Sequence, residues 1–212
     1  MKYNKYLSCI LLTIMSLYTS IASSQTLLIM GDSLSASYNI PLESGWVELL
    51  KQRIKQNGYP TTVVNASISG ETTGNAVKRL PGLLDKHNPD IVLIELGGND
   101  GLRGFELKSI KQNLSEMIEA AQAKGAKVIL TGIHIPPNYG PAYTQIFYNA
   151  YLNLSKKYET LFIPFILEGV GDKPQLMQAD GVHPTKEAQP KVLDNMWPQI
   201  KAAIEPSKNA QN

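Results

Sequence analysis

The run IVLIEL at residues 91–96 limits the possible folds of this chain more than any other stretch, because almost all of it is apolar. A strand of this kind needs apolar cover on both faces, as the strands of parallel sheets have. Other runs rich in strand-forming residues occur at 26–30, 62–65, 127–131 and 161–164. Segments with helical apolar spacing alternate with these runs, at 46–56, 73–87, 108–124, 142–158 and 187–204.

This alternation predicts the α/β class, with a central parallel sheet of about five strands between two layers of helices. The chain contains no internal repeat, low-complexity tract or linker, so we expect one domain over residues 25–212. Functional residues in parallel α/β sheets follow the carboxyl ends of the strands. The sequence therefore predicts a site built from the residues directly after each strand.

Residues 1–24 have the pattern of a secretory signal peptide. Lys2 and Lys5 form a short positive segment, an apolar stretch follows, and small residues then offer a cleavage site. The apolar stretch is too short to span a bilayer. We predict cleavage after Ser24, or alternatively after Ala22, and a periplasmic or secreted mature protein without a stable membrane anchor.

Charge and cysteine content exclude several classes of function for the mature chain. Loss of Lys2 and Lys5 lowers the formal charge from +2 to 0, which leaves no electrostatic attraction for nucleic acid. The single cysteine, Cys9, lies in the predicted leader, so disulfides and thiolate ligands are excluded from the domain. Its three histidines are scattered without a recognised metal-ligand spacing, so we expect no metal.

Small and polar residues follow the predicted strands. Gly31-Asp32-Ser33 comes after the first, NASISG (65–70) after the second, GGNDG (97–101) after the third, and Gly132-Ile133-His134 after the fourth. DGVHP (180–184) lies downstream of the fifth. Each stretch alone is ordinary turn sequence, but parallel strands bring their carboxyl ends to one edge. Together they form a candidate constellation for acyl transfer.

His183 is the best candidate for a general base, because Asp180 precedes it by three residues. A carboxylate there would hold the Nδ1–H of the imidazole and leave Nε2 to accept a proton from a serine. Ser33, directly after the first strand, is the candidate nucleophile. An Asp-Gly turn beside a structural histidine is the alternative interpretation, since short motifs often match by accident.

Other ionisable residues near the strand ends are weaker candidates. His87 lies at the C-terminus of a predicted helix, where a cation is favoured, and His134 has no acidic residue close in sequence. Asp32 is the neighbour of Ser33 and is poorly placed to reach the far side of a histidine. We interpret Asp32 and Asp100 as residues that support their turns by accepting backbone N–H groups.

Three groups are candidates for an oxyanion hole, which needs donors set where negative charge develops on the substrate. The Ser33 N–H lies at a strand-to-helix turn, and the Gly70 N–H is free of side-chain obstruction. The side-chain amide of Asn99 follows the third strand. Turn formation is the alternative for Gly70 and Asn99 taken singly. Their recurrence on neighbouring strand ends favours the functional interpretation.

These blocks resemble the GDSL, or SGNH, hydrolase family. The resemblance rests on GDSLS (31–35), Gly70, GGND (97–100) and DGVHP (180–184), found in this order. VVNASISGETT, IELGGNDGLRGF, IPPNYG and MQADGVHP are similar to a branch of multifunctional periplasmic bacterial esterases, and the likeness extends over most of the mature chain. GDSLS lacks the second glycine of the G-x-S-x-G elbow, which separates it from the larger α/β-hydrolase group.

The resemblance implies a flavodoxin-like SGNH fold that needs neither cofactor nor metal. It implies hydrolysis of thioesters, aryl and alkyl esters and lysophospholipids. By position, Ser33 would be the nucleophile, His183 the general base and Asp180 the acid that orients it. Ser33, Gly70 and Asn99 would form the oxyanion hole.

The loop after the fourth strand, IHIPPNYG (133–140), is expected to flank the acyl chain of the substrate. It has a histidine where close relatives carry an arginine, which leaves the chain-length preference open. The predicted pocket walls are Ile133, Ile135, Pro136 and Tyr139, with Tyr143 beside them. Ordinary loop packing is the alternative for each of these residues.

We therefore expect a monomer that acts on a small-molecule ester or lipid and has no nucleic-acid partner. Two other functions stay open at this point. One is a cell-envelope carbohydrate O-deacetylase of the same superfamily, and the other is a catalytically silent envelope-binding module. The presence of serine, aspartate, histidine, glycine and asparagine at the strand ends argues against the silent module.

Overall fold

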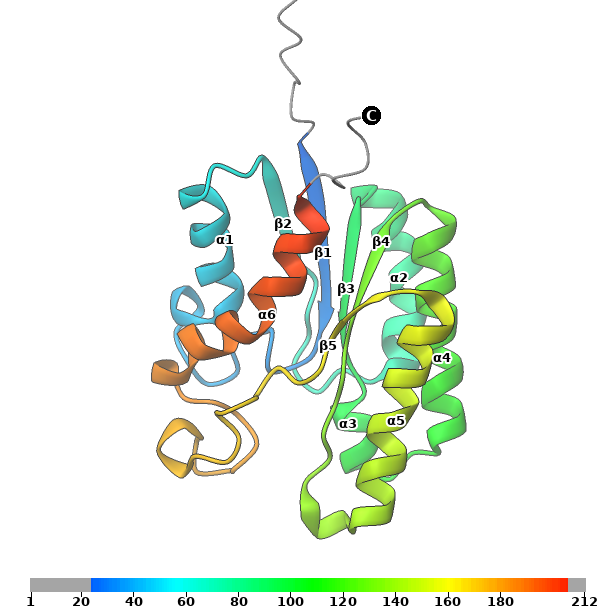
Figure 1. Cartoon of the computed structure of the whole chain (residues 1–212), viewed down its shortest axis with the longest axis vertical. Coiled ribbons are helices and arrows are strands. Elements are labelled where there is room, and N and C mark those ends of the chain that lie inside the picture. Colours follow the sequence, from blue (N-terminus) through cyan, green and yellow to red (C-terminus); the bar gives the residue numbers. More distant parts are fainter. Residues whose placement is uncertain (1–23, 206–212) are drawn as a thin grey trace, which may run out of the picture.

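The computed structural model describes residues 24–205 and contains one sheet of five parallel strands (Figure 1). The strand order is β2-β1-β3-β4-β5, and every neighbouring pair is parallel. The strands are β1 (Gln25–Gly31), β2 (Thr61–Asn65), β3 (Ile91–Glu95), β4 (Lys127–Thr131) and β5 (Leu161–Ile163). The predicted α/β class and parallel sheet are confirmed.

The five predicted helices are all present, with bounds that differ from the predicted ones by at most two residues. They are α1 (Trp46–Gln56), α2 (Thr73–His87), α4 (Leu107–Ala123), α5 (Pro141–Tyr158) and α6 (Gln189–Ile204). A further short helix, α3 (Gly98–Leu102), was not predicted, because its glycine-rich sequence has the composition of a turn. Single turns of 3-10 helix complete the described chain, at η1 (Leu42–Ser44), η2 (Pro137–Tyr139), η3 (Pro174–Leu176) and η4 (Lys186–Ala188).

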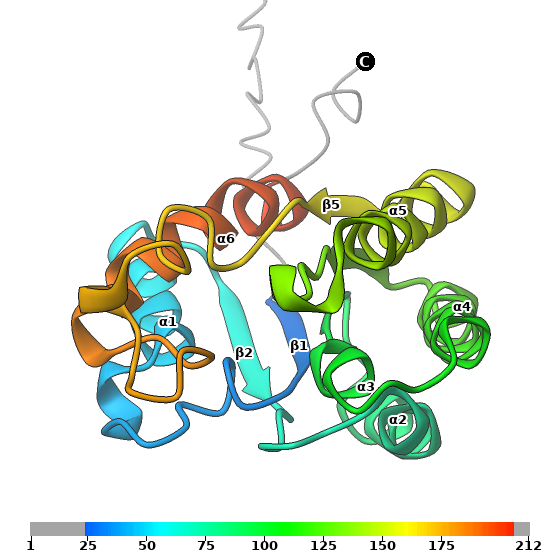
Figure 2. The ribbon, with the colours of Figure 1, turned by 90° about the horizontal axis from the view of Figure 1, so that it is seen from below.

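Strand β3 is buried along its whole length, as its apolar sequence predicts. Val92 and Ile94 pack into the core against α2, α4 and α5, whereas Ile91 and Leu93 pack on the opposite face against α1 and α6. Burying one such side chain contributes roughly 1.5–3 kcal/mol. The two cores make three layers, with α1 and α6 on one side of the sheet and the other long helices opposite (Figure 2).

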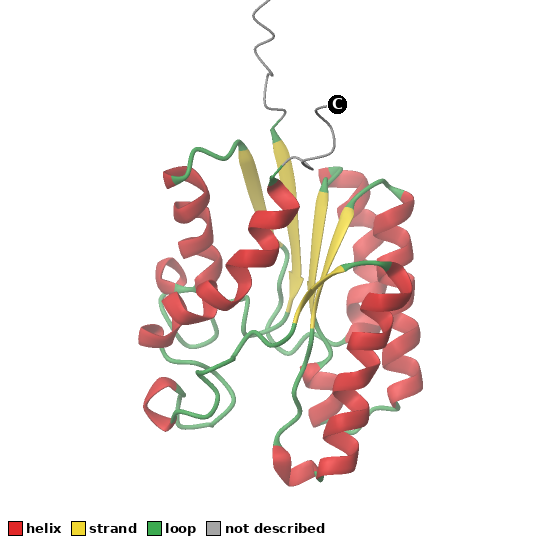
Figure 3. Cartoon of the chain, in the orientation of Figure 1, coloured by secondary structure: helices red, strands yellow, loops and turns green. Residues whose placement is uncertain are grey.

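The strand order places the two central strands at a topological switch point. From β1 the chain continues to β2 on one side and then returns to β3 on the other side, which is the flavodoxin-like order. In open α/β sheets, ligands bind at such a point, at the carboxyl edge of the strands. Loops and short turns gather at this edge, at the bottom of Figure 3. Ser33 and Asn99 lie in the segments that follow these two strands.

The predicted signal peptide covers residues 1–24, of which 1–23 lie outside the described residues. Among the helices within residues 24–205, none combines the length and the apolar composition needed to cross a membrane.

The turn between β3 and α3 requires glycine at position 97. Gly97 has a φ of 109°, a backbone conformation that residues with a Cβ rarely adopt. A Cβ at this position would lie 1.8 Å from the hydroxyl oxygen of Tyr151. That hydroxyl donates a hydrogen bond of 2.9 Å to the carbonyl of Leu96 and so holds the end of β3. The turn that delivers Asn99 therefore packs directly against α5.

We predict that Gly97→Ala destabilises the protein more than Gly104→Ala, although φ is positive at both positions. A Cβ at Gly104 would meet no heavy atom of the described chain within 4 Å, so that variant carries only the backbone cost, about 1–2 kcal/mol. Gly97→Ala must also displace Tyr151, which adds roughly 1–3 kcal/mol. Urea unfolding of both variants measures the difference. Equal losses of stability would show that Tyr151 does not constrain the turn.

Candidate active site

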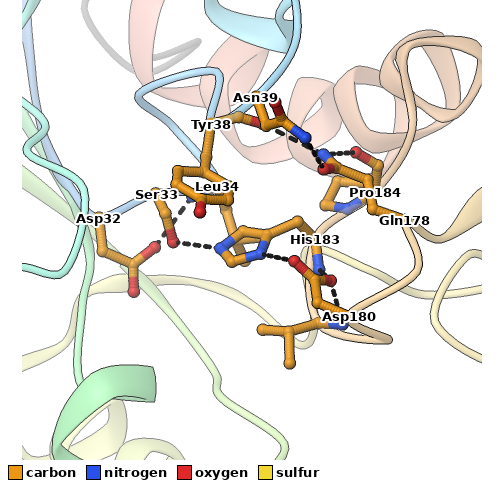
Figure 4. Close-up of polar contacts among 10 residues, drawn as sticks. Asp32, Ser33, Leu34, Tyr38, Asn39, Gln178, Asp180, His183 and Pro184 are labelled. Carbon is orange, nitrogen blue, oxygen red and sulfur yellow. Dashed lines mark hydrogen bonds and ion pairs between the residues drawn. The ribbon is translucent and has the colours of Figure 1, made fainter.

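Ser33, His183 and Asp180 form a continuous hydrogen-bonded chain at the carboxyl edge of the sheet (Figure 4). The Nε2 atom of His183 lies 2.8 Å from the Ser33 Oγ, and its Nδ1 atom lies 2.7 Å from the Asp180 Oδ2. A carboxylate only accepts hydrogen bonds, so Nδ1 carries the proton and Nε2 is left to accept from the serine hydroxyl. The structure thus brings together three residues that the sequence predicted as a set.

Asp180 is held as a carboxylate by its own loop. Its Oδ1 accepts hydrogen bonds from the backbone N–H groups of Val182 (2.9 Å) and His183 (3.0 Å). Burial alone would raise its pKa, but these two bonds and the contact with the imidazole outweigh burial and lower the pKa of Asp180 to about 2. The carboxylate is therefore ionised throughout the neutral range and fixes the orientation of the histidine ring.

The backbone N–H groups of Ser33 and Gly70 donate no hydrogen bond to any part of the chain within residues 24–205. Gly70 has a φ of 77°, which glycine adopts without strain. Its carbonyl accepts a hydrogen bond of 3.2 Å from the guanidinium of Arg103. Both N–H groups are thus available for a ligand at the positions predicted for an oxyanion hole.

The side chain of Asn99, in α3, is oriented by Asp32. The Nδ2 of Asn99 donates a hydrogen bond of 3.1 Å to the Asp32 Oδ2, which leaves the second N–H of the amide for another acceptor. The other carboxylate oxygen of Asp32 accepts from the backbone N–H of Leu34 at 3.0 Å. Asp32 supports the turn after β1, as its sequence position indicated. Its contact with Asn99 was not predicted.

Asp100, the neighbour of Asn99, is hydrogen-bonded to Thr73, which lies three residues after Gly70. Its carboxylate accepts from the backbone N–H of Thr73 at 3.0 and 3.2 Å and from the Thr73 hydroxyl at 2.6 Å. Thr73 is the first residue of α2, so Asp100 also provides negative charge at the N-terminus of that helix. This buried side chain therefore fixes the spacing between the loops after β2 and β3.

Glu95 is a buried acid beneath the site that sequence reasoning missed as a functional residue. It is 0% exposed at the end of β3, and its Oε2 accepts from the Ser35 hydroxyl at 2.8 Å and from the Asp32 N–H at 3.4 Å. The available signal was its position as the single charged residue of IVLIEL. A charge in a strand covered on both faces indicates a specific partner at the strand end.

Glu95 and Asp32 titrate as neighbours that cannot both ionise easily. Burial, and then the negative charge of Asp32, raise the pKa of Glu95 well above its usual range. Burial also raises the pKa of Asp32 from 3.8 to about 6, although the Leu34 N–H, the charge of His183 and the Asn99 amide act in the opposite direction. Burial thus favours the protonated form of Glu95, whereas Asp32 is the acid whose carboxylate orients Asn99.

The predicted pocket walls lie in two different environments. Ile133 and Ile135 are only 6% and 4% exposed, and their side chains belong to the core shared with α4 and α5. Pro136 is half-buried, and Tyr139 is 39% exposed and donates a hydrogen bond of 3.0 Å to the carbonyl of Leu102. The assignment of these four residues to an acyl pocket stays a prediction.

His134, also in this loop, packs its ring against two aromatic side chains. The ring centroids of Tyr148 and Phe165 lie 4.3 Å and 4.6 Å from it. His134 therefore takes part in an aromatic cluster rather than in the chain of Ser33 and His183. Within residues 24–205, no group of three or more histidine, cysteine, aspartate or glutamate side chains has an arrangement that could hold a metal ion.

The sheet is flavodoxin-like, and at its carboxyl edge a serine is hydrogen-bonded to a histidine, which is hydrogen-bonded to an aspartate. This combination defines a serine hydrolase of the SGNH type. Residues 29–189 match the model of the GDSL-like Lipase/Acylhydrolase family. The chain belongs to this family, and the family resemblance found in the sequence is confirmed.

Two curated relatives and one solved structure are similar over nearly the whole domain. Esterase TesA of Pseudomonas aeruginosa is 49% identical over 188 residues, which are 89% of this chain and 94% of the relative. Thioesterase 1/protease 1/lysophospholipase L1 of Escherichia coli K12 is 43% identical over 183 residues, 86% of each chain. The crystal structure of TesA, 50% identical, superimposes with a TM-score of 0.83 and covers 84% of this chain and 99% of that chain.

We predict that Glu95→Gln gains stability relative to the wild type as the pH rises above 4.5, the usual pKa of glutamate. Folded Glu95 holds its proton above the pH at which the unfolded residue releases it, so wild-type folding takes up a proton and stability falls as the pH rises. Glutamine cannot ionise and still offers an acceptor to Ser35. Urea unfolding midpoints across this range measure the effect.

The exposed Glu43→Gln serves as the control for this measurement. A difference between wild type and Glu95→Gln that stays constant across the pH range would contradict the raised pKa of Glu95.

Proposed function

We propose that this protein is a serine esterase that hydrolyses carboxylic esters and acyl thioesters, including aryl and alkyl esters and lysophospholipids. The observation that carries the proposal is the hydrogen-bonded chain from Ser33 through His183 to Asp180, with separations of 2.8 and 2.7 Å. The names of the two relatives, an esterase and a thioesterase/lysophospholipase, support this substrate class.

In the first step of the proposed mechanism, Ser33 Oγ attacks the acyl carbon while Nε2 of His183 takes the hydroxyl proton. The imidazolium that forms is stabilised by the carboxylate of Asp180, which stays ionised because its pKa is about 2. The negative charge that develops on the substrate oxygen is met by the N–H groups of Ser33 and Gly70 and by the Asn99 amide. His183 then protonates the leaving alcohol or thiol, and an acyl-enzyme remains.

In the second step, His183 takes a proton from water, and the resulting hydroxyl attacks the acyl carbon of the ester on Ser33. The same donors hold the oxyanion, and His183 returns the proton to Ser33 as the carboxylic acid leaves. In both steps, residues of this chain transfer the protons and stabilise the oxyanion. The mechanism needs no metal or cofactor.

We also propose that the protein is exported to the periplasm or beyond, with residues 1–24 as the cleaved leader. The support is the order of positive, apolar and small residues in this segment. In that compartment lysophospholipids and other lipid esters are more accessible substrates than coenzyme-bound thioesters. Thioester hydrolysis is then a property of the same active site rather than its main use.

We expect purified protein to release p-nitrophenol from short- and medium-chain acyl esters, and free thiol from acyl thioesters. Ser33→Ala should lower kcat for both substrate types by about four to six orders of magnitude. Asn99→Ala should lower kcat by about 100- to 1000-fold, because it removes one oxyanion donor. Steady-state kinetics with both substrates measure these effects.

Turnover confined to O-acetylated glycans would replace the esterase proposal with the deacetylase alternative. Turnover by Ser33→Ala equal to that of the wild type would exclude Ser33 as the nucleophile.

For export, we expect the full-length chain expressed in a Gram-negative host to be recovered from the periplasmic fraction with Gln25 as its first residue. N-terminal mass spectrometry of that fraction gives the cleavage site, and a start at Ser23 would indicate cleavage after Ala22. Recovery from the cytoplasm with residues 1–24 intact would contradict the proposed leader.

A further inference from the structure

Gln178 links the loop that carries Asp180 and His183 to the turn that follows Ser33. We call residues 177–184 the acid–base loop. The Gln178 Nε2 donates to the carbonyl of Tyr38 at 3.1 Å and to the carbonyl of Pro184 at 3.0 Å. Its Oε1 accepts from the Nδ2 of Asn39 at 3.0 Å. One side chain thus makes two polar contacts across the site and one within its own loop (Figure 4).

The acid–base loop is fixed at its two ends, where Met177 packs against the core and Pro184 is buried. Met177 and Pro184 form an antiparallel bridge, and Gln178 N donates to His183 O at 2.7 Å. Residues 179–182, at the tip, are exposed. These bonds hold Asp180 near His183. They do not set the distance from His183 to Ser33, which lies 150 residues away in the sequence.

The aromatic ring of Tyr38 packs against the imidazole ring of His183. The ring centroids are 4.3 Å apart with an interplanar angle of 35°. The side chain of Tyr38 is 46% exposed, so this placement is not the result of burial in the core. An aromatic face also favours the imidazolium that the proposed mechanism forms. Tyr38 therefore limits the position of the base as well as covering it.

The backbone on either side of Tyr38 is left-handed, because Ser37 and Asn39 have φ values of 59° and 54°. Asparagine adopts this region more readily than most residues, but serine seldom does. The conformation of Ser37 therefore depends on surrounding contacts. The bonds of Gln178 to Tyr38 O and to the Asn39 side chain are contacts of that kind.

We propose that Gln178, Asn39 and Tyr38 form a clasp that positions the His183 imidazole against the Ser33 hydroxyl. The clasp rests on the proposed serine-esterase mechanism and adds three positioning residues to it. Gln178 and Asn39 act through the acid–base loop, and Tyr38 acts through its ring contact with His183. Loss of the clasp lets the acid–base loop shift as a unit, so that the contact of His183 with Asp180 survives while the contact with Ser33 lengthens.

The test compares Gln178→Leu with the matched control Gln112→Leu on p-nitrophenyl ester substrates. Gln112 is an exposed glutamine whose Nε2 donates to Glu116 within helix α4, away from the acid–base loop. We expect Gln178→Leu to lower kcat by about 10- to 100-fold, the effect of a small misplacement of reacting groups. Its KM should stay close to that of the wild type. Gln112→Leu should leave both constants unchanged.

Two further comparisons separate positioning from a loss of folding. Asn39→Ala changes an exposed side chain and should lower kcat in the same direction but less. The double variant should be no slower than Gln178→Leu alone, since both substitutions open one clasp. Tyr38→Phe keeps the ring and should retain activity, whereas Tyr38→Ala should lower kcat with little change in KM.

Wild-type turnover that is lost in Ser33→Ala establishes the mechanism on which the clasp rests. With that result in hand, folded Gln178→Leu and Asn39→Ala with wild-type kcat would overturn the clasp and leave the esterase proposal intact. Multiplicative losses in the double variant would also overturn it, because they would show that the two side chains act separately.

Discussion

The parallel alignment of the five strands is the constraint on which the candidate site depends. It sends the loops after β1, β2 and β3 to one edge of the sheet, so that Ser33, Gly70 and Asn99 arrive there from three separate parts of the chain. His183 reaches the same edge differently, on a loop with an exposed tip that follows β5 at some distance. The sheet thus fixes the candidate nucleophile and the candidate oxyanion donors, while side-chain contacts between loops place the candidate base.

Buried acids beneath the site account for much of its electrostatics. Asp32, Glu95 and Asp100 are each at most 4% exposed. Asp32 directly follows β1, Glu95 ends β3, and Asp100 lies in α3, the helix after β3. Three negative charges there would destabilise the negative charge that develops on the substrate oxygen in the proposed mechanism. Burial raises the pKa of Glu95 and so favours its uncharged form. The carboxylates of Asp32 and Asp100 accept hydrogen bonds from the Asn99 amide and from the start of α2. The acids therefore orient the candidate oxyanion donors at a limited electrostatic cost.

Much of this arrangement could be predicted from the sequence, because apolar runs mark the strands and the residues after them form the site. The contact of Ser33 with His183 follows from that pattern together with Asp180 three residues before the histidine. The remaining features depend on contacts between distant segments, which no local pattern records. Gln178 lies 140 residues from Tyr38, and α3 forms in a sequence that reads as a turn. The buried placement of Ile135 likewise depends on its packing beside Gly101, which only the folded chain reveals.

The most direct test of the account is to locate the covalent adduct formed by a fluorophosphonate, which reacts with an activated serine. We predict one adduct per chain on the peptide that contains Ser33, and no adduct after Asp180→Asn or His183→Ala under the same conditions. An adduct on another serine, or modification of Ser33 that proceeds equally well without His183, would contradict the proposed nucleophile and its base.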